Sequence, residues 1–353
     1  MRTRLLTVGI AGVAAALGIG TAVIPVDLDH PRTRPSLRAS SRSSLRETRR
    51  SGRSWSRPKE RSTGRVLIAL SPSSSSTASW CGDTRCCGTN QLPDWLTSGV
   101  ANGTIGNAQL RNLLHQHIVT EVSRYKGRIW QWDVANEFFT DSNPSTINPN
   151  DFWISHLGTG IIADAFRWAH QADPRALLFY NDYNIAGEDG TNAKSDAVFA
   201  WLKQMLAQGV PINGVGDQGH LDTQYGFSGT QMTQDLQRYA SLGLKVAITE
   251  ADVRTFVNNA TDQVPTDHLA TFAQPAEFGQ MLKACLAVRQ CISFTVWGFG
   301  DAESWVPGFF TGEGYATIYD VNLNPKPTYT ELQQDLRLAA FGAPHRVPSG
   351  AGR

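Results

Sequence analysis

From residue 90 onward, short apolar runs alternate with longer segments in which apolar positions recur at helical spacing. The apolar runs predict five strands, at 129–134, 176–180, 214–219, 245–249 and 292–297. The segments between them predict five helices, at 107–125, 159–171, 192–208, 230–243 and 275–288. Strands that alternate with helices in this way run parallel and are joined by crossover helices. The pattern therefore predicts an α/β fold.

A closed barrel is favoured over an open doubly wound sheet because no glycine-rich phosphate loop follows a first strand.

Two of the predicted strands deliver a glutamate at their carboxyl end. Glu137 closes the stretch Trp132-Asp-Val-Ala-Asn-Glu137, and Glu250 follows Ile248 and Thr249. Barrel enzymes place their chemistry at the carboxyl ends of the strands, so we expect the two side chains to lie near each other. Glycoside hydrolysis needs such a pair, since one carboxyl group protonates the leaving oxygen and the other attacks the sugar. The strand ends therefore favour a glycosidase.

The part of the chain before residue 90 has a different composition. Two arginines, an uncharged apolar run and then Gly20-Thr-Ala22 predict a secretory signal peptide over 1–22, with an uncleaved signal anchor as the alternative. Residues 23–89 form a low-complexity segment rich in Arg, Ser and Pro, in which only 65–70 resembles a strand. This composition predicts disorder, because it offers too little apolar area to bury. A nucleic-acid- or heparin-binding arm is the alternative, but interleaved aromatic residues are almost lacking.

Charge is divided unevenly along the chain. Residues 31–65 carry 12 basic side chains against two acidic ones, while the whole chain has a formal charge of +1, so the remainder is net acidic. An acidic domain favours neither nucleic acid nor an anionic membrane as a partner. We assign 90–340 to the barrel and 341–353 to a C-terminal tail, and we expect a monomer.

Five cysteines are an odd number for a secreted protein. Cys285 and Cys291 are separated by five residues and are able to close a small loop. Cys81, Cys86 and Cys87 lie close together without a histidine nearby, so a zinc site there would lack a fourth ligand. We therefore expect no metal.

The strand ends and several further motifs resemble glycoside hydrolase family 10, the endo-β-1,4-xylanases, which have a (β/α)8 TIM barrel. The resembling segments are Asn90-Gln-Leu-Pro-Asp-Trp95, Trp132-Asp-Val-Ala-Asn-Glu137, Asn181-Asp-Tyr-Asn184, Gly216-Asp-Gln-Gly-His220, Ile248-Thr-Glu-Ala-Asp252, Thr295-Val-Trp-Gly298, Ser304-Trp305 and Asn324-Pro-Lys-Pro-Thr-Tyr329. They occur in the family's order and span about 90–335. The resemblance implies a hydrolase that degrades xylan, with xylan or xylo-oligosaccharides as its partner and no cofactor. The predicted signal peptide implies a secreted, extracellular product.

By this resemblance Glu137 is the general acid/base and Glu250 the nucleophile of a retaining mechanism. Such a mechanism places the two carboxyl groups about 5–5.5 Å apart, with one protonated and the other ionised. Asn136 is expected to hydrogen-bond the sugar 2-OH, and Gln218 to contact the glycone sugar. These four residues are the centre of the predicted site.

His220 is expected to hydrogen-bond Glu250 and to hold it ionised and oriented. Asp252, two residues along the same strand, is expected to orient that histidine or to balance its charge. The resemblance also implies a disulfide between Cys285 and Cys291, which fits an oxidising destination.

Three aromatic residues are expected to bind sugar rings. Trp297 and Trp305 would wall the glycone side, and Tyr183 would stack on the leaving-group side. The alternative for each is a core aromatic residue, which is what we expect of Trp132.

The resemblance fails before residue 90. The family's first two strands carry an Asn and a Lys that bind the glycone sugar, and its third strand ends in Arg-Gly-His…Trp-His. This chain instead reads Ser79-Trp-Cys-Gly-Asp-Thr-Arg-Cys-Cys-Gly-Thr89. Codons can be chosen for these residues so that reading from the third base gives Leu-Val-Arg-Gly-His-Ala-Leu-Leu-Trp-His. We hypothesise that much of the region up to Thr89 is an out-of-frame translation. We therefore expect a barrel whose first two strands, and most of the third, are unrecognisable.

Two rival functions remain open. A β-1,4-glucanase differs only in the sugar it accepts, and an unusual loop at 306–315 is able to alter that fit. An inactive carbohydrate-binding remnant is the second rival, because the glycone residues of the first strands are missing.

Overall fold

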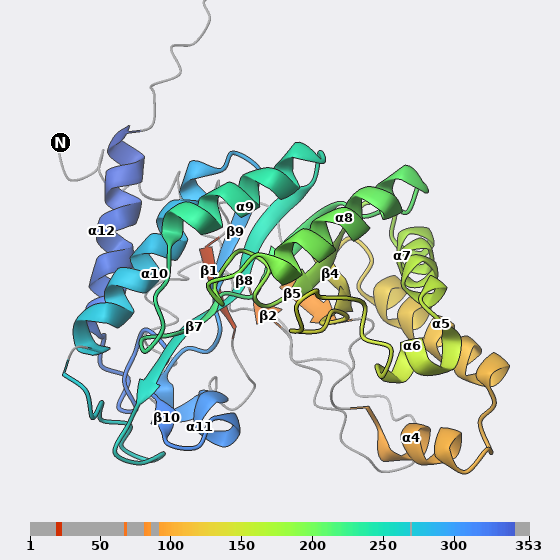
Figure 1. Cartoon of the computed structure of the whole chain (residues 1–353), viewed down its shortest axis with the longest axis horizontal. Helices are drawn as coiled ribbons and strands as arrows, with labels where there is room; N and C mark the ends of the chain where they lie inside the picture. The colour runs from red at the N-terminus through yellow and green to blue at the C-terminus, as the bar shows by residue number, and fades with distance from the viewer. Residues whose placement is uncertain (1–18, 23–66, 69–80, 86–91, 269, 343–353) are drawn as a thin grey trace, which may run out of the picture.

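The structure is a computed structural model that describes residues 19–22, 67–68, 81–85, 92–268 and 270–342. Within these residues eight strands close into a ring, which confirms the predicted α/β barrel (Figure 1). In spatial order they are β8 (Lys245–Phe256), β6 (Gly214–Asp217), β5 (Leu177–Asp182), β4 (Ile129–Asn136), β3 (Cys81–Arg85), β2 (Leu67–Ile68), β1 (Ile19–Ala22) and β9 (Cys291–Val296). Pairing of β9 with β8 completes the ring, so the edges that an open sheet would expose are absent from it.

Short strands from the segment that does not resemble the family fill the first three places of the ring. β1 pairs in parallel with β9, and β3 pairs in parallel with β4. β2, which falls in the strand-like run at 65–70, is antiparallel to both of its neighbours. β1 falls within the predicted signal peptide; the rest of 1–22, most of 23–89 and 343–353 lie outside the described residues. The described ring is therefore parallel except at β2.

Helices surround the ring (Figure 1). They are α4 (Asp94–Ala101), α5 (Asn107–Arg124), α6 (Phe152–Leu157), α7 (Gly160–Ala172), α8 (Ala193–Ala207), α9 (Gly229–Ser241), α10 (Ala270–Ala287) and α12 (Pro327–Gly342). In α5 the buried residues Leu110, Leu114, Ile118 and Val122 recur every four positions and form one apolar stripe. Burial of each such side chain contributes about 1.5–3 kcal/mol, so packing on the barrel holds the helix.

The helix predicted from Pro275 begins five residues earlier than expected. Proline suits the first turn of a helix because it has no N–H group to donate. In the structure Pro275 lies inside α10, and Ala270 and Gln274 before it are buried. The Gln274 amide donates to the Val253 carbonyl oxygen at 2.8 Å, which ties this extra turn to β8.

β8 is longer than its predicted range of 245–249. Its first part pairs with β6 up to Ile248, and its second part pairs with β7 (His220–Asp222) and with β10 (Glu313–Gly314). Neither partner strand was predicted. The continuation was missed because Glu250, Asp252 and Arg254 interrupt the apolar pattern, although these positions are buried or half-buried.

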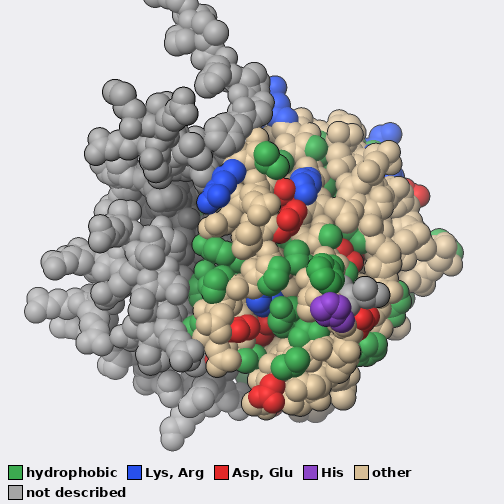
Figure 2. All heavy atoms as spheres, turned by 90° about the vertical axis from the view of Figure 1, so that its left-hand side faces the viewer, with side chains coloured by type: hydrophobic (Ala, Val, Ile, Leu, Met, Phe, Trp, Pro, Cys, Tyr) green, Lys and Arg blue, Asp and Glu red, His purple; other side chains and the backbone are tan. Residues whose placement is uncertain are grey.

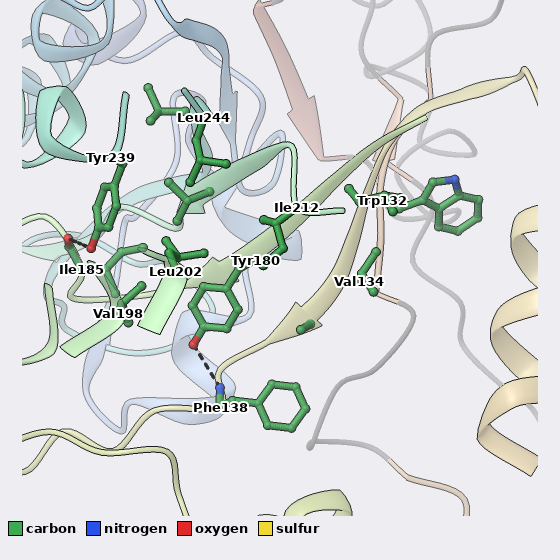
Figure 3. Close-up of a cluster of buried hydrophobic side chains, with 14 of the residues drawn as sticks. Trp132, Val134, Phe138, Tyr180, Ile185, Val198, Leu202, Ile212, Tyr239 and Leu244 are labelled. Carbon is green, nitrogen blue, oxygen red and sulfur yellow. Dashed lines mark hydrogen bonds between the residues drawn. The ribbon is translucent and has the colours of Figure 1, made fainter. Parts of the chain in front are cut away.

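Aliphatic and aromatic side chains pack together in the buried hydrophobic core (Figure 3). Trp132 is fully buried in this core, as expected. The Tyr180 hydroxyl accepts a hydrogen bond from the Phe138 N–H group at 3.3 Å and donates one to the Asp182 carboxylate. This fixes the turn that follows Glu137. In the described part of the chain, no helix has both the length and the apolar character that crossing a membrane requires.

Candidate active site

The two glutamates lie at the carboxyl-terminal edge of the ring. Glu137 immediately follows β4, as predicted. Glu250 does not end its strand, which corrects the expectation, because β8 runs on to Phe256. It nevertheless stands where β8 leaves the ring, since pairing with β6 ends at Ile248 and pairing with β9 ends at Ala251. Both side chains therefore reach the same face of the barrel.

A chain of amide groups joins the two glutamates. The Gln218 amide nitrogen donates to Glu137 Oε1 at 2.8 Å and to Asn136 Oδ1 at 3.3 Å. The Asn181 amide nitrogen donates to the same Asn136 oxygen and to Glu250 Oε1, both at 2.9 Å. Three buried amides from β4, β5 and the end of β6 thus hold both carboxyl groups in fixed positions.

Asn181 was not predicted as a site residue, although it begins one of the quoted motifs. Its side-chain oxygen accepts a hydrogen bond from the Thr249 hydroxyl at 2.7 Å, which fixes the orientation of its amide. Its position near the end of a buried strand, where polar groups are rare unless bonded, was the signal that could have identified it.

The backbone of Glu137 is in the left-handed region, with φ of 60°. A side chain other than glycine rarely adopts this conformation, which costs of order 1–3 kcal/mol and recurs at functional sites. The Glu137 N–H group donates to the Asn181 carbonyl oxygen at 3.0 Å and stabilises the turn. The strained turn aims the half-buried carboxyl group at Gln218.

His220 lies between two carboxylates. Its Nδ1 is 2.9 Å from Asp252 Oδ1, and its Nε2 is 3.6 Å from Glu250 Oε2. Burial alone would lower the pKa of His220, but the Asp252 and Glu250 carboxylates outweigh it and raise the pKa to about 10. The imidazole is therefore a cation at neutral pH, and it favours the ionised form of the Glu250 carboxyl group.

Asp252 also binds Trp305. The Trp305 indole N–H group donates to Asp252 Oδ2 at 2.7 Å, and its ring lies 5.0 Å from the His220 ring. Trp297 is buried and packs against Trp305. Trp297, Trp305 and Asp252, which were all predicted as site residues, thus lie together on the His220 side of the site.

Tyr183 lies in a separate cluster beside Glu137. Its hydroxyl donates to Asp141 Oδ2 at 2.7 Å, and the Lys194 ammonium lies 3.6 Å from the centre of its ring. Lys194 also pairs with Asp182 at 2.9 Å and with Asp141 at 3.0 Å. One side of the tyrosine ring is therefore engaged by a cation.

Lys194 was not predicted, because a lysine in the first turn of α8 carries no sequence signal for a site. It is only 2% exposed and neutralises Asp182, which is fully buried. Burial raises the pKa of Asp182 to about 6 in spite of this pairing. The pKa of Lys194 is raised as well: burial lowers it, but the two carboxylates outweigh burial.

The sulfur atoms of Cys285 and Cys291 lie 2.01 Å apart, at bonding distance, and link the end of α10 to the start of β9. Across the described residues, no group of three or more His, Cys, Asp or Glu side chains is arranged to hold a metal ion.

Comparisons with known proteins identify relatives of this chain. The sequence model of glycosyl hydrolase family 10 matches residues 82–335. The endo-1,4-beta-xylanase of Agaricus bisporus is 38% identical over 240 residues, and endo-1,4-beta-xylanase B of Thermotoga neapolitana is 37% identical over 245 residues. These alignments cover 68% and 69% of this chain and 66% of each relative, so the chain spans just under two thirds of their length.

The fold has solved counterparts. The crystal structure of xylanase 10B from Thermotoga petrophila RKU-1 in complex with xylobiose has a TM-score of 0.65 and 37% identity, covering 72% of this chain and 73% of that one. The GH10 xylanase from Bispora sp. MEY-1, also with xylobiose, has a TM-score of 0.64 and 30% identity, covering 72% and 75%. The family match over most of the chain and these structural relatives establish that the chain belongs to glycosyl hydrolase family 10.

Proposed function

We propose that this protein is a retaining endo-1,4-β-xylanase that hydrolyses the β-1,4-xylosidic backbone of xylan. The observation that carries the proposal is the bonded array between the glutamates, in which Gln218, Asn136 and Asn181 connect Glu137 to Glu250. Relatives that carry the name endo-1,4-beta-xylanase support xylan as the substrate.

The two glutamates act in two steps. In the first, the Glu250 carboxylate attacks the anomeric carbon, the glycosidic C–O bond breaks, and Glu137 gives its proton to the departing oxygen. In the second, the Glu137 carboxylate takes a proton from water, the water oxygen attacks the anomeric carbon, and the ester to Glu250 breaks. His220 stabilises the Glu250 carboxylate before attack and after its release.

The remaining residues bind and position the sugars. Asn136 hydrogen-bonds the 2-OH of the sugar under attack, a contact that strengthens in the transition state. Gln218 contacts the glycone sugar, and Trp297 and Trp305 present apolar ring faces on that side. Tyr183, supported by Lys194, lies on the leaving-group side.

The test is hydrolysis of xylan by the full chain, with the product anomer followed by NMR. The β-anomer should form first, since two displacements at one carbon retain its configuration. Glu250→Gln and Glu137→Gln should each lower kcat at least ~10³-fold, because each removes a group that makes or breaks a bond. The exposed Glu303→Gln serves as the matched control. Initial release of the α-anomer, or full activity of Glu250→Gln, would refute the proposal.

The two rival functions are decided by the same preparation. Hydrolysis of carboxymethylcellulose as fast as xylan would identify a β-1,4-glucanase. Binding of xylan without hydrolysis would identify a carbohydrate-binding remnant. The hydrogen bonds that hold both glutamates favour the enzyme, since a binding protein does not need two carboxyl groups at fixed positions relative to each other.

We also propose that the protein is secreted and monomeric, with a disulfide between Cys285 and Cys291. An apolar run near the N-terminus supports secretion, and a sulfur pair at bonding distance supports the disulfide. Mass spectrometry of the medium fraction, with and without reduction, tests both the location and the bond.

A further inference from the structure

An aromatic cluster, Trp305, Phe309 and Phe310, extends outward from the site along the short helix α11 (Val306–Phe309). The ring centre of Trp305 lies 5.3 Å from that of Phe309 and 5.5 Å from that of Phe310, and the two phenylalanine rings are 4.9 Å apart. Phe310 is half-buried, whereas Phe309 is 72% exposed. Phe309 thus adds an open aromatic face to the wall that begins with Trp305.

The segment that carries Phe309 is anchored although the side chain is exposed. The Arg254 guanidinium lies 4.0 Å from the centre of the Phe310 ring and pairs with Glu313 at 2.6 Å and with Asp222 at 3.2 Å. β10, which follows the cluster, pairs with the outer part of β8. The backbone that carries Phe309 is therefore held in place before any ligand arrives, which limits the entropy lost on binding.

Exposure alone does not mark a binding residue, because single apolar side chains are common on protein surfaces. Hydrophobic side chains also gather on the lower half of the face in Figure 2, and Phe272 and Tyr225 are 65% and 67% exposed. Phe309 differs because its ring contacts Trp305, whose indole nitrogen is bonded to Asp252 beside His220. Its surface is continuous with the proposed sugar site.

We infer that Phe309 is a sugar-stacking platform that takes one further pyranose ring of a β-1,4-linked xylan chain, beyond the ring that lies against Trp305. This inference rests on the proposed function. Flat apolar ring faces with fixed orientation suit the C–H face of a pyranose, and aromatic side chains line most sugar-sized sites. Because the platform lies outside the array that holds Glu137 and Glu250, it binds substrate and transition state equally. It therefore lowers KM and leaves kcat unchanged.

The experiment compares Phe309→Ala with Phe309→Trp and with the control Phe272→Ala, an exposed phenylalanine on α10. Each is assayed with xylohexaose and with p-nitrophenyl β-xyloside, which is too short to reach the platform. Phe309→Ala should raise KM for xylohexaose about 10-fold at unchanged kcat, because it removes binding shared by both states. Its kcat/KM for the short substrate should match the unaltered chain. Phe309→Trp and Phe272→Ala should behave like the unaltered chain on both substrates.

A binding measurement separates this inference from the function on which it rests. Calorimetry with xylohexaose should show a Kd about 10-fold higher for Phe309→Ala than for the unaltered chain, whether or not hydrolysis occurs. Unchanged KM and Kd in Phe309→Ala would overturn the inference while xylan hydrolysis stood. Equal loss on the long and the short substrate would also overturn it. Failure of the unaltered chain to bind xylohexaose at all would overturn both proposals.

Discussion

His220 acts on the site through charge as well as through shape. It is 2.9 Å from Asp252 and 3.6 Å from Glu250, and these carboxylates raise its pKa to about 10 against the effect of burial. A cation in this position stabilises the nucleophile before attack and fixes Asp252, which in turn holds Trp305. One side chain thus links the charge of the site to the orientation of its aromatic wall.

His220→Gln should lower kcat/KM about 10²-fold, since a preorganised charged donor is lost. The pKa of His220 rises on folding from an ordinary 6.5 to about 10. Its stabilising effect is therefore complete below about pH 6.5 and is lost as pH rises through 10. Urea unfolding should show a larger loss of stability for the variant at pH 6 than at pH 10.5. Equal losses at both pH values would contradict a charged histidine.

Lys194→Met should destabilise the protein through Asp182. Removal of one partner of a buried ion pair costs about 3–5 kcal/mol, because the other charge stays buried. The pKa of Asp182 is already raised to about 6 beside Lys194, and loss of the ammonium raises it further. The loss in unfolding free energy should thus be smaller at pH 5, where Asp182 is neutral, than at pH 8. Lys203→Met, an exposed lysine on α8, should have little effect at either pH.

At the scale of elements, the sequence predicted those helices and strands that have a continuous apolar pattern. The strand predicted at 129–134 is present as β4, in which every residue is buried except the half-buried Trp130. The outer half of β8, with β7 and β10, was missed because these strands pair outside the ring and carry charged residues. Arg254 is the clearest case, since its ion pairs with Glu313 and Asp222 form only when three distant segments meet.

A second effect of a buried charge arises in α10, beside the outer half of β8. Glu277 is 7% exposed, and no described residue donates a hydrogen bond to its Oε2. Burial, and then repulsion by Asp222, raise the pKa of Glu277 from 4.5 to about 7. Folding therefore penalises the ionised form, and the protein loses stability as pH rises from 4.5 through 7.

Glu277→Gln should remove that penalty. At pH 8.5 the variant should be more stable than the unaltered chain by about 1–3 kcal/mol, because each unit of pKa shift corresponds to about 1.4 kcal/mol. At pH 3, below the pKa of both states, the carboxyl group is neutral in each and the difference should largely vanish. Thermal unfolding at both pH values measures this, with Glu303→Gln as the exposed control. A variant less stable than the unaltered chain at pH 8.5 would show that ionisation of Glu277 does not destabilise the folded protein.

At the scale of the whole molecule, the barrel is closed by its least typical strands. β2 is two residues long and runs against both neighbours, while β1 falls in the predicted signal peptide. Polar residues at the ends of β4, β5 and β6 allowed the site to be predicted, but no sequence pattern predicted how the ring closes. The family match likewise begins only at residue 82, within β3.

The hypothesis of an out-of-frame segment makes a specific prediction about this closure. β3 occupies Cys81–Arg85, inside the stretch Ser79–Thr89 for which codons can be chosen so that another frame encodes Leu-Val-Arg-Gly-His. An apolar strand that ends in polar groups suits the third place of a barrel better than Cys-Gly-Asp-Thr-Arg, because interior positions are filled by large apolar side chains. Sequencing of the transcript across this junction should therefore show that the alternative frame joins Asn90 without interruption. A protein expressed from the corrected frame should unfold at a higher urea concentration than the present chain. One continuous frame with codons that do not encode the alternative peptide would rule the hypothesis out.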